Sequence, residues 1–312
     1  MSPSFLIVGG TGNTGRGVVE ILSKTLPNHP KFSGYRLLLQ TRSASGSAAK
    51  ELAKLPHVEL VEVNWPEITS EWLREQKVAR VFIASHLRPN QFSEESTFLL
   101  AALHAEVEYV VRISTTTTNV RPDCPAYYPR THWAIETMLE QPAFSKLNWT
   151  SLQPTGFAPM ILYPAAELIK RVRAGEKQNT LRILFNEAPS AMIDPYDISR
   201  MAAALLIQED ISKHSKAKYT LTGPEDINGE GIVAMVEKYI GTKVEDVSYK
   251  DVSVLDEVFA VPGESKNVLG SANLGPLTTW EGLLSTSTIS KEVLELAPPT
   301  VTPADTLKAL LQ

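Results

Sequence analysis

A glycine-rich segment near the start of the chain limits the choice of fold more than any other part of the sequence. The segment GGTGNTG, residues 9–15, follows an apolar run at residues 5–8 and precedes GVVEILSKTL, whose apolar positions recur at helical spacing. Residues without a β-carbon let backbone N–H groups and the positive end of a helix approach a pyrophosphate. The order strand, glycine loop, helix therefore predicts a dinucleotide site, with either Gly9 or Gly10 as its first glycine. The residues expected to form it are Gly9, Thr11, Gly12, Asn13, Thr14 and Gly15.

The pattern of an apolar run followed by a helical segment repeats through the first half of the chain. Further strand-like runs are YRLLLQTR, VELVEVNW, ARVFIAS and VEYVVRIST, and WTSLQPTGF adds a sixth strand that ends at Pro154. Continuous apolar runs that alternate with helices are typical of a parallel sheet covered on both faces. We therefore expect an α/β fold with a doubly wound parallel Rossmann sheet.

The strict alternation ends after residue 155, which indicates a second unit. Residues 1–155 are expected to form the dinucleotide-binding Rossmann domain. Residues 192–222, which include the apolar helical pattern DISRMAAALLIQ, are expected to return to its sheet. Residues 156–191 and 223–312 are expected to form a smaller, mixed α/β lobe that binds the substrate.

Composition and charge narrow the class of protein. The chain has 312 residues, of which 43% are hydrophobic, and this suffices for one large core with a smaller lobe. A formal net charge of −5 argues against a nucleic-acid partner, which requires a basic face. The single cysteine, Cys124, suits a reducing compartment, and the first apolar run is too short for a signal peptide or a membrane span. We expect a cytoplasmic monomer or homodimer with a small-molecule partner and no metal, since no ligand cluster has metal-site spacing.

The end of the second predicted strand indicates which dinucleotide binds. Sites that prefer NAD usually end this strand with an acidic residue that binds the adenosine ribose. Here the strand ends in Thr41, Arg42 and Ser43. A guanidinium can donate two hydrogen bonds to the 2′-phosphate of NADP, and the hydroxyls of Thr41 and Ser43 can donate further ones. NADP(H) is therefore favoured. Asn64, at the end of the third strand, is either an adenine contact or a polar strand end.

Several segments taken together resemble the NmrA-like branch of the atypical short-chain dehydrogenases. They are the glycine loop, Thr41–Ser43, HWAIETML, WTSLQPTGF and IDPYDISRMAAALL, within residues 4–222. That branch contains NADP-dependent reductases of the isoflavone reductase type, tailoring enzymes of fungal secondary metabolism, and co-regulators that bind NADP(H) without turnover. The resemblance implies NADP(H) as the cofactor, whereas the activity depends on the site.

The stretch YYPRTHWAIE holds the main departure from that family. Many members carry a lysine four residues before a glutamate on this helix, and in relatives that reduce substrates the lysine contacts the nicotinamide ribose. Here Glu136 matches the glutamate and His132 stands in place of the lysine. The imidazole is expected to contact the ribose or to shuttle a proton, with Glu136 keeping it partly protonated. A surface histidine–glutamate pair is the simpler alternative.

The tyrosines of this stretch are the other expected proton donors. Tyr128, with Tyr127 as its rival, precedes Pro129, so we expect a helix over residues 130–139 with Tyr128 at its cap. Whether Tyr128 or His132 donates a proton is left open by the sequence.

Polar residues at the ends of neighbouring strands are expected to border one crevice. Ser85 and His86 follow the fourth strand, and Ser114 or Thr115 follows the fifth, where short-chain dehydrogenases hold a hydroxyl that orients the substrate. The resemblance places four residues after the sixth strand near the nicotinamide carboxamide: Pro154, Thr155, Gly156 and Phe157. An apolar wall for a bulky substrate is expected from Tyr127, Phe157, Met160, Tyr163 and Met192.

Two functions fit these features. The first is an NADP(H)-dependent reductase or redox-linked cyclase that acts on a bulky apolar heterocyclic or aromatic small molecule. The resemblance to fungal tailoring members implies alkaloid-type biosynthesis, with hydride transfer coupled to ring closure or cycloaddition. The second is a non-catalytic co-regulator that senses NADP(H) and binds a protein partner. An enclosed apolar cavity at the nicotinamide favours the enzyme, whereas an exposed apolar patch favours the regulator.

Overall fold

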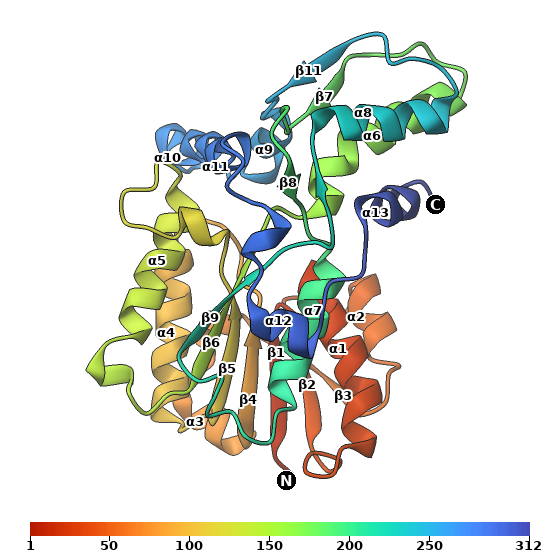
Figure 1. Cartoon of the computed structure of the whole chain (residues 1–312). Coiled ribbons are helices and arrows are strands. Elements are labelled where there is room, and N and C mark those ends of the chain that lie inside the picture. Colours follow the sequence, from red (N-terminus) through yellow and green to blue (C-terminus); the bar gives the residue numbers. More distant parts are fainter.

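The computed structural model describes all 312 residues and contains a sheet of seven parallel strands (Figure 1). In spatial order the strands are β3 (Val58–Glu62), β2 (Arg36–Thr41), β1 (Ser4–Val8), β4 (Val78–Ile83), β5 (Tyr109–Ile113), β6 (Trp149–Pro154) and β9 (Ala217–Leu221). The chain builds outward from β1 to β3 and then crosses back to continue with β4 on the other side of β1. The predicted doubly wound parallel Rossmann sheet is confirmed.

Helices cover both faces of the sheet because most of its strands carry apolar side chains on both sides. Phe82 of β4 packs on one face and its neighbour Val81 on the other. The first face is covered by α1 (Asn13–Thr25), α2 (Ser47–Leu52) and α7 (Pro195–Leu206) (Figure 1). The second face is covered by α3 (Ser70–Glu75), α4 (Gln91–His104) and α5 (Tyr127–Leu139). None of the helices combines the length and the apolar character that a membrane span requires.

A third apolar cluster holds together a smaller lobe beyond the C-terminal ends of the strands (Figure 1). The short strands pair as β7 with β11 and as β8 with β10. The elements of this part are α6 (Ala158–Arg173), β7 (Leu181–Ile183), β8 (Ser190–Ala191), β10 (Asp226–Ile227), α8 (Gly229–Ile240), β11 (Val247–Tyr249), α9 (Ser253–Val258), α10 (Lys266–Gly270), α11 (Leu277–Trp280) and α13 (Pro303–Leu310). The lobe therefore lies at the edge of the sheet where ligands bind in open α/β folds.

One helix lies elsewhere than the sequence predicts. α12 (Lys291–Leu296) packs on β9 and α7, although residues 223–312 are predicted to belong to the smaller lobe. At its start, the Ser290 N–H donates to the Thr220 carbonyl at 3.0 Å, and Ser290 Oγ accepts from the Thr220 N–H at 2.8 Å. These bonds satisfy backbone groups of β9, which is an edge strand. Val293 of α12 belongs to the apolar cluster on the face of the sheet that α1 and α7 cover.

Candidate functional site

The glycine loop turns tightly at the N-terminal end of α1. Gly9 adopts the left-handed conformation with a φ of +71°, and its N–H donates to Gln40 Oε1 at 3.0 Å. The Gly12 N–H donates to the Gly9 carbonyl at 2.9 Å. A β-carbon on Gly15 would lie 2.2 Å from that carbonyl oxygen, so this approach requires glycine. No side chain caps α1, which leaves N–H groups of its first turn available to an anion.

A cavity of about 370 Å³ lies over this loop, and we call it the glycine-loop cleft. Residues predicted to bind the dinucleotide line it: Gly9, Thr11, Gly12, Asn13, Thr14, Thr41, Arg42, Asn64, Ser85, His86 and Phe157. The other residues predicted for the cofactor are outside its lining: Gly15, Ser43, Ser114, His132, Pro154, Thr155 and Gly156. The structure thus brings the loop together with the ends of β2, β3 and β4.

The end of β2 presents a free guanidinium to the cleft. Arg42 is exposed, and its side chain forms no hydrogen bond or ion pair within the protein. The loop that carries it is fixed, because Glu62 Oε2 accepts from the Ala44 N–H at 2.9 Å and Thr41 Oγ1 accepts from the Ser43 N–H at 3.2 Å. An unpaired arginine beside an uncapped helix N-terminus suits a ligand with more than one phosphate group.

Sequence reasoning missed several side chains of this cleft: Gln40, Trp65, Arg88 and Glu94. His86 Nδ1 accepts from the Arg88 N–H at 3.1 Å, so the ring proton lies on Nε2 and is donated to Glu94 Oε2 at 2.6 Å. The Arg88 side chain, like that of Arg42, has no hydrogen bond or ion pair within the protein. Arg88 could have been predicted as a cleft residue, because it lies two residues after His86, at a strand end that the sequence already indicates as a border of the crevice.

The first turn of α5 includes both tyrosines of the YYPRTHWAIE stretch. The helix begins at Tyr127, so the prediction that Tyr128 lies at the cap is wrong. The helix tolerates Pro129 because N–H groups of a first turn have no intrahelical partner to lose. The Tyr127 O–H donates to the Leu87 carbonyl. The Tyr128 ring stacks on Phe259 with 5.1 Å between centroids, and burial raises the pKa of its phenol.

A layer of buried polar side chains lies between α5 and the sheet, and we call it the polar layer. The Arg112 guanidinium of β5 donates to Glu95 Oε1 at 2.6 Å, to Ser151 Oγ at 2.8 Å and to His132 Nδ1 at 2.9 Å. Ser151 Oγ in turn donates to Glu136 Oε1 at 2.6 Å. Each of these five side chains is at most 1% exposed. A buried charge network of this kind fixes the positions of its members.

His132 is neutral in this layer. A guanidinium has only donors, so His132 Nδ1 accepts and the ring proton lies on Nε2. Burial, followed by the charge of Arg112, holds the pKa of the imidazole well below its usual value. Glu136 accepts hydrogen bonds from Ser151 and, at 3.0 Å, from Gln153 Nε2. The prediction that Glu136 keeps His132 partly protonated is therefore wrong, because the partner of the ring is a cation.

Three buried polar atoms near the ends of β5 and β6 have no hydrogen-bond partner: Ser114 Oγ, His132 Nε2 and Thr155 Oγ1. The ladder continues past both strands, since the Ser114 N–H donates to Leu152 and the Thr155 N–H donates to Leu221. Ser114 lies two residues after Arg112, and Thr155 lies four after Ser151, so both share the face of the polar layer. An unpaired buried polar group costs about 1–3 kcal/mol. Unpaired groups of Ser114 and Thr155 on the side of the sheet where α5 and His132 pack suit a polar ligand.

The residues after β6 are held by hydrogen bonds to the segments that precede α7 and follow β5. The Gly156 carbonyl accepts from the Ile193 N–H at 2.9 Å, and the Pro154 carbonyl accepts from Thr116 Oγ1 at 3.3 Å. Phe157 follows and reaches the glycine-loop cleft. This segment therefore links the cleft to the unpaired atoms at the ends of β5 and β6.

The predicted apolar wall is divided in the structure. Tyr127, Met160 and Met192 pack in or against the apolar cluster of the smaller lobe. Tyr163 is 48% exposed and lines a separate depression of about 640 Å³ between α6, β7 and α9. Of the predicted wall, only Phe157 lines the glycine-loop cleft.

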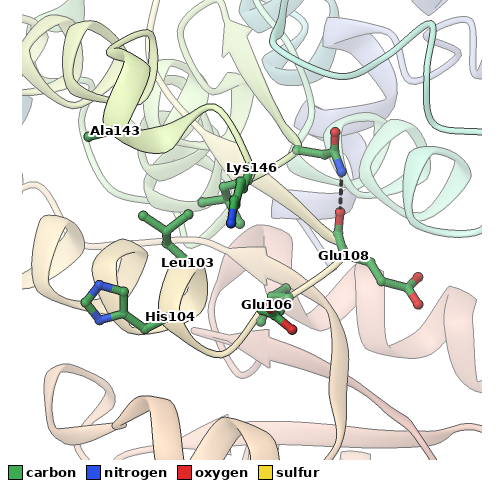
Figure 2. Close-up of a pocket in the computed structure, with 9 residues that line it drawn as sticks. Leu103, His104, Glu106, Glu108, Ala143 and Lys146 are labelled. Atoms are coloured by element: carbon green, nitrogen blue, oxygen red, sulfur yellow. Dashed lines mark hydrogen bonds between the residues drawn. The ribbon is translucent and has the colours of Figure 1, made fainter.

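A hollow of about 630 Å³ lies at the opposite end of the sheet (Figure 2). Leu103 and His104 end α4, while Glu106 and Glu108 precede β5 and Lys146 precedes β6 (Figure 2). The hollow thus borders the N-terminal ends of these strands, whereas ligands of open parallel sheets bind at the C-terminal ends. None of the predicted site residues lines it.

Comparison with known proteins gives a family and a set of similar folds. The sequence model of the NmrA-like family matches residues 1–279. No curated protein matches the chain. Among solved structures, an NADPH-dependent quinone oxidoreductase from Escherichia coli in complex with NADPH has a TM-score of 0.72 at 19% identity, over 99% of this chain and 100% of that one. The triphenylmethane reductase of Citrobacter sp. in complex with NADP(H) has a TM-score of 0.69 at 15% identity, over 98% and 100%.

A structure with a different activity is also similar. The UDP-glucuronic acid 4-epimerase of Bacillus cereus, in complex with UDP-glucuronic acid and NAD, has a TM-score of 0.65 at 16% identity, over 99% of this chain and 98% of that one. At these identities the likenesses show the fold, and reductases and epimerases share it.

Proposed function

The chain belongs to the NmrA-like family, and we propose that it is an oxidoreductase that binds NADP(H) in the glycine-loop cleft. Its substrate in this proposal is a bulky, apolar heterocyclic or aromatic small molecule. The cofactor would supply or accept a hydride, and the residues of the chain would bind, orient and shield the reacting groups.

The observation that carries the proposal is the pairing of two anion-binding features in one cleft. The uncapped first turn of α1 and the Gly12 N-cap suit a pyrophosphate. The free guanidinium of Arg42 lies at the end of β2, where a 2′-phosphate distinguishes NADP from NAD. Arg88 adds a second unpaired cation to the same cleft. A site for NAD(H) would instead place a carboxylate at the end of β2.

The other end of the cofactor would lie near the ends of β5 and β6. Ser114 Oγ, His132 Nε2 and Thr155 Oγ1 are buried and unpaired there, so they suit the hydroxyl and amide groups of a nicotinamide riboside. Phe157 reaches the cleft from the same segment and would shield the ring from water. In this proposal His132 is a hydrogen-bond donor to the ligand.

Proton transfer by these residues would be limited. The lowered pKa of His132 makes it a poor general acid at neutral pH, and the raised pKa of the Tyr128 phenol keeps it protonated. This combination favours reactions in which hydride transfer needs little proton donation, such as reduction of an iminium carbon. A reaction in which hydride transfer is coupled to ring closure is also compatible with these pKa shifts, because the shape of the cavity would then direct cyclisation.

The substrate class draws on the named activities of similar structures and on the site. The reductases among them are named for quinones and for triphenylmethane compounds, both of which contain planar, unsaturated rings. Phe157 in the cleft is an apolar neighbour for such a ring system.

A non-catalytic NADP(H)-sensing co-regulator is the second candidate. The ring of Phe259, which belongs to the smaller lobe, packs on the Tyr128 ring, and this contact favours the co-regulator. The test is NADPH consumption with a panel of quinones, triphenylmethane dyes and cyclic iminium compounds. Turnover with any of them supports the enzyme. Tight NADPH binding without turnover across the panel would favour the co-regulator, and absence of NADPH binding would contradict both.

A further inference from the structure

We infer that Arg112 is a positioning residue that fixes the tautomer of His132, so that the ring presents a permanent N–H donor at Nε2 to an oxygen of the bound cofactor. The identity of the ligand rests on the proposed function, whereas the tautomer is a property of the protein alone.

The bonds of Arg112 leave the imidazole one arrangement. Its Nε donates to Glu95 Oε1 at 2.6 Å, its Nη1 to Ser151 Oγ at 2.8 Å and its Nη2 to His132 Nδ1 at 2.9 Å. A guanidinium cannot accept a hydrogen bond and stays charged in proteins. A proton on Nδ1 would therefore face a donor and a cation at once. Only the neutral ring with its proton on Nε2 satisfies this geometry.

Arg112 is held in place by Glu95, which also binds Ser85 of the glycine-loop cleft. Glu95 Oε2 accepts from Ser85 Oγ at 2.9 Å and from Gln91 Nε2 at 3.2 Å, and Ser85 lines the cleft. With both oxygens of Glu95 bound, the carboxylate fixes the guanidinium and, through it, the imidazole. The hydrogen-bonded chain runs from Ser85, after β4 in the cleft wall, through α4 and β5 to α5.

The charges around the ring do not favour a second proton on it. Arg112 of β5 contacts the ring, and ion pairs connect Arg112 to Glu95 of α4 and Glu136 of α5. Lys218 of β9 pairs in turn with Glu136 and with Glu140 of α5, and Tyr128 lies four residues before His132 on α5. Glu95 contacts Arg112, and Glu136 lies 3.5 Å from both Arg112 Nη1 and Lys218 Nζ. Each buried carboxylate already has a cation, so neither needs a protonated imidazole.

Other buried polar atoms on the α5 side of the sheet also lack partners. His132 Nε2, Ser114 Oγ and Thr155 Oγ1 lack partners, and all three residues are at most 4% exposed. Ser114 and Thr155 lie on the α5 side of the sheet, as Arg112 does. A fixed donor on the side of the sheet to which two unpaired hydroxyls point suits an oxygen acceptor. The imidazole is a neutral donor, and the nearest positive charge is on Arg112, which donates a hydrogen bond to the other ring nitrogen. A lysine ammonium at this position would itself carry a positive charge.

The tautomer is measured by two-bond ¹H–¹⁵N correlation spectra of the full chain labelled with ¹⁵N-histidine. The signals of His132 are assigned by their loss in His132→Gln. We expect protonated Nε2 and unprotonated Nδ1 throughout the range of about pH 5 to 8, in which free imidazole titrates. A protonated Nδ1, or titration of His132 within this range, would overturn the inference.

The role of Arg112 is tested by Arg112→Met combined with Glu95→Gln, which removes both charges of the buried pair and avoids an unpaired carboxylate. In this variant we expect His132 to populate both tautomers or to titrate within the same pH range. A single, non-titrating Nε2–H tautomer would show that Arg112 does not set it. The spectra of the unaltered chain decide the tautomer even where the variant does not fold.

The donor role is tested by NADPH affinity. His132→Phe should weaken NADPH binding about two- to tenfold, the range for loss of one neutral hydrogen bond. His132→Gln keeps an N–H donor and should recover most of the affinity. Equal NADPH binding by the two variants and the unaltered chain would overturn the donor role. Failure of the unaltered chain to bind NADPH would contradict the proposed function, while the spectra would still decide the tautomer.

Discussion

The glycine-loop cleft lies at the C-terminal edge of the sheet and the polar layer lies between the sheet and α5, and the cations of the two regions differ in whether they have partners. In the cleft, Arg42 and Arg88 have no partner within the protein and face an open cavity. In the polar layer, Arg112 is fully buried and bonded to Glu95, Ser151 and His132. Free cations suit an anionic ligand that brings the missing charge. Paired cations suit the precise placement of a neutral donor.

The difference suggests a division of labour along a bound cofactor. The phosphate-rich half would be held by charges that the protein leaves unsatisfied. The nicotinamide half would meet hydrogen-bonding groups whose own charges are already balanced, which avoids a net field at the reacting carbon. Substitutions in the two regions should therefore have effects of different kinds and sizes.

The largest effect is expected in the glycine loop. In Gly15→Ala the new β-carbon would lie 2.2 Å from the Gly9 carbonyl oxygen and 2.7 Å from the α-carbon of Gly10, so the loop must move. We expect loss of NADPH binding and about 1–3 kcal/mol of stability. Gly34→Ala is the matched control, because no atom lies within 4 Å of its added carbon. Calorimetric titration of both variants checks the result, and retained NADPH binding in Gly15→Ala would contradict the site.

Arg42→Ala should act on one cofactor only. Loss of a charge-assisted contact to a phosphate costs about 1.5–3 kcal/mol, which corresponds to about 10- to 100-fold weaker NADPH binding. NADH lacks the 2′-phosphate, so its affinity should stay unchanged and serves as the internal control. Fluorescence titration with both nucleotides measures the ratio. An equal loss for NADPH and NADH would remove the 2′-phosphate assignment.

The polar layer should appear in the pH dependence of stability. The pKa of His132 is lowered in the folded chain, so below the ordinary histidine pKa of about 6.5 the unfolded chain binds one more proton. The free energy of unfolding should therefore fall as the pH drops below about 6.5, by at most about 1.4 kcal/mol per pH unit from this residue. His214, whose pKa is also lowered by burial, acts in the same direction.

Comparison with His132→Gln isolates the contribution of His132. Urea unfolding between about pH 5 and 8 should give a steeper slope for the unaltered chain than for this variant. Equal slopes would mean that His132 titrates alike in both states, contrary to its place beside Arg112.

The smallest effect is expected from Ser114→Ala. The hydroxyl is buried and unpaired, so its removal should leave the stability of the ligand-free chain unchanged or slightly higher. NADPH binding should weaken about two- to tenfold, because one hydrogen bond to the cofactor is lost. Thermal unfolding with and without NADPH measures both effects. A fall in ligand-free stability together with unchanged NADPH binding would make Ser114 a structural residue.

The fold and the cleft could be predicted because their signals are local. The glycine segment stands between a strand and a helix, and Arg42 directly follows the second strand, so adjacent residues identify both. The smaller lobe was harder to predict, since α12 packs on β9 next to the hydrogen bonds between Ser290 and Thr220, seventy residues away.

The polar layer could not be predicted because its pairs join distant segments. Arg112 stands inside the apolar run YVVRI and Glu95 inside the helix of α4, seventeen residues apart. A charged residue within a buried strand was the available signal, since such a group needs a partner. Tyr128 was misplaced for another reason. The steric restriction on the residue before proline disfavours the helical conformation without forbidding it, and Pro129 itself costs no N–H bond in a first turn.

The most direct test of both regions is a crystal structure of the chain with NADPH. We expect the 2′-phosphate within about 3 Å of the Arg42 guanidinium and the nicotinamide half hydrogen-bonded to His132 Nε2 and Ser114 Oγ. A nucleotide whose 2′-phosphate lies away from β2, or whose nicotinamide half does not reach the ends of β5 and β6, would contradict the division between the two regions.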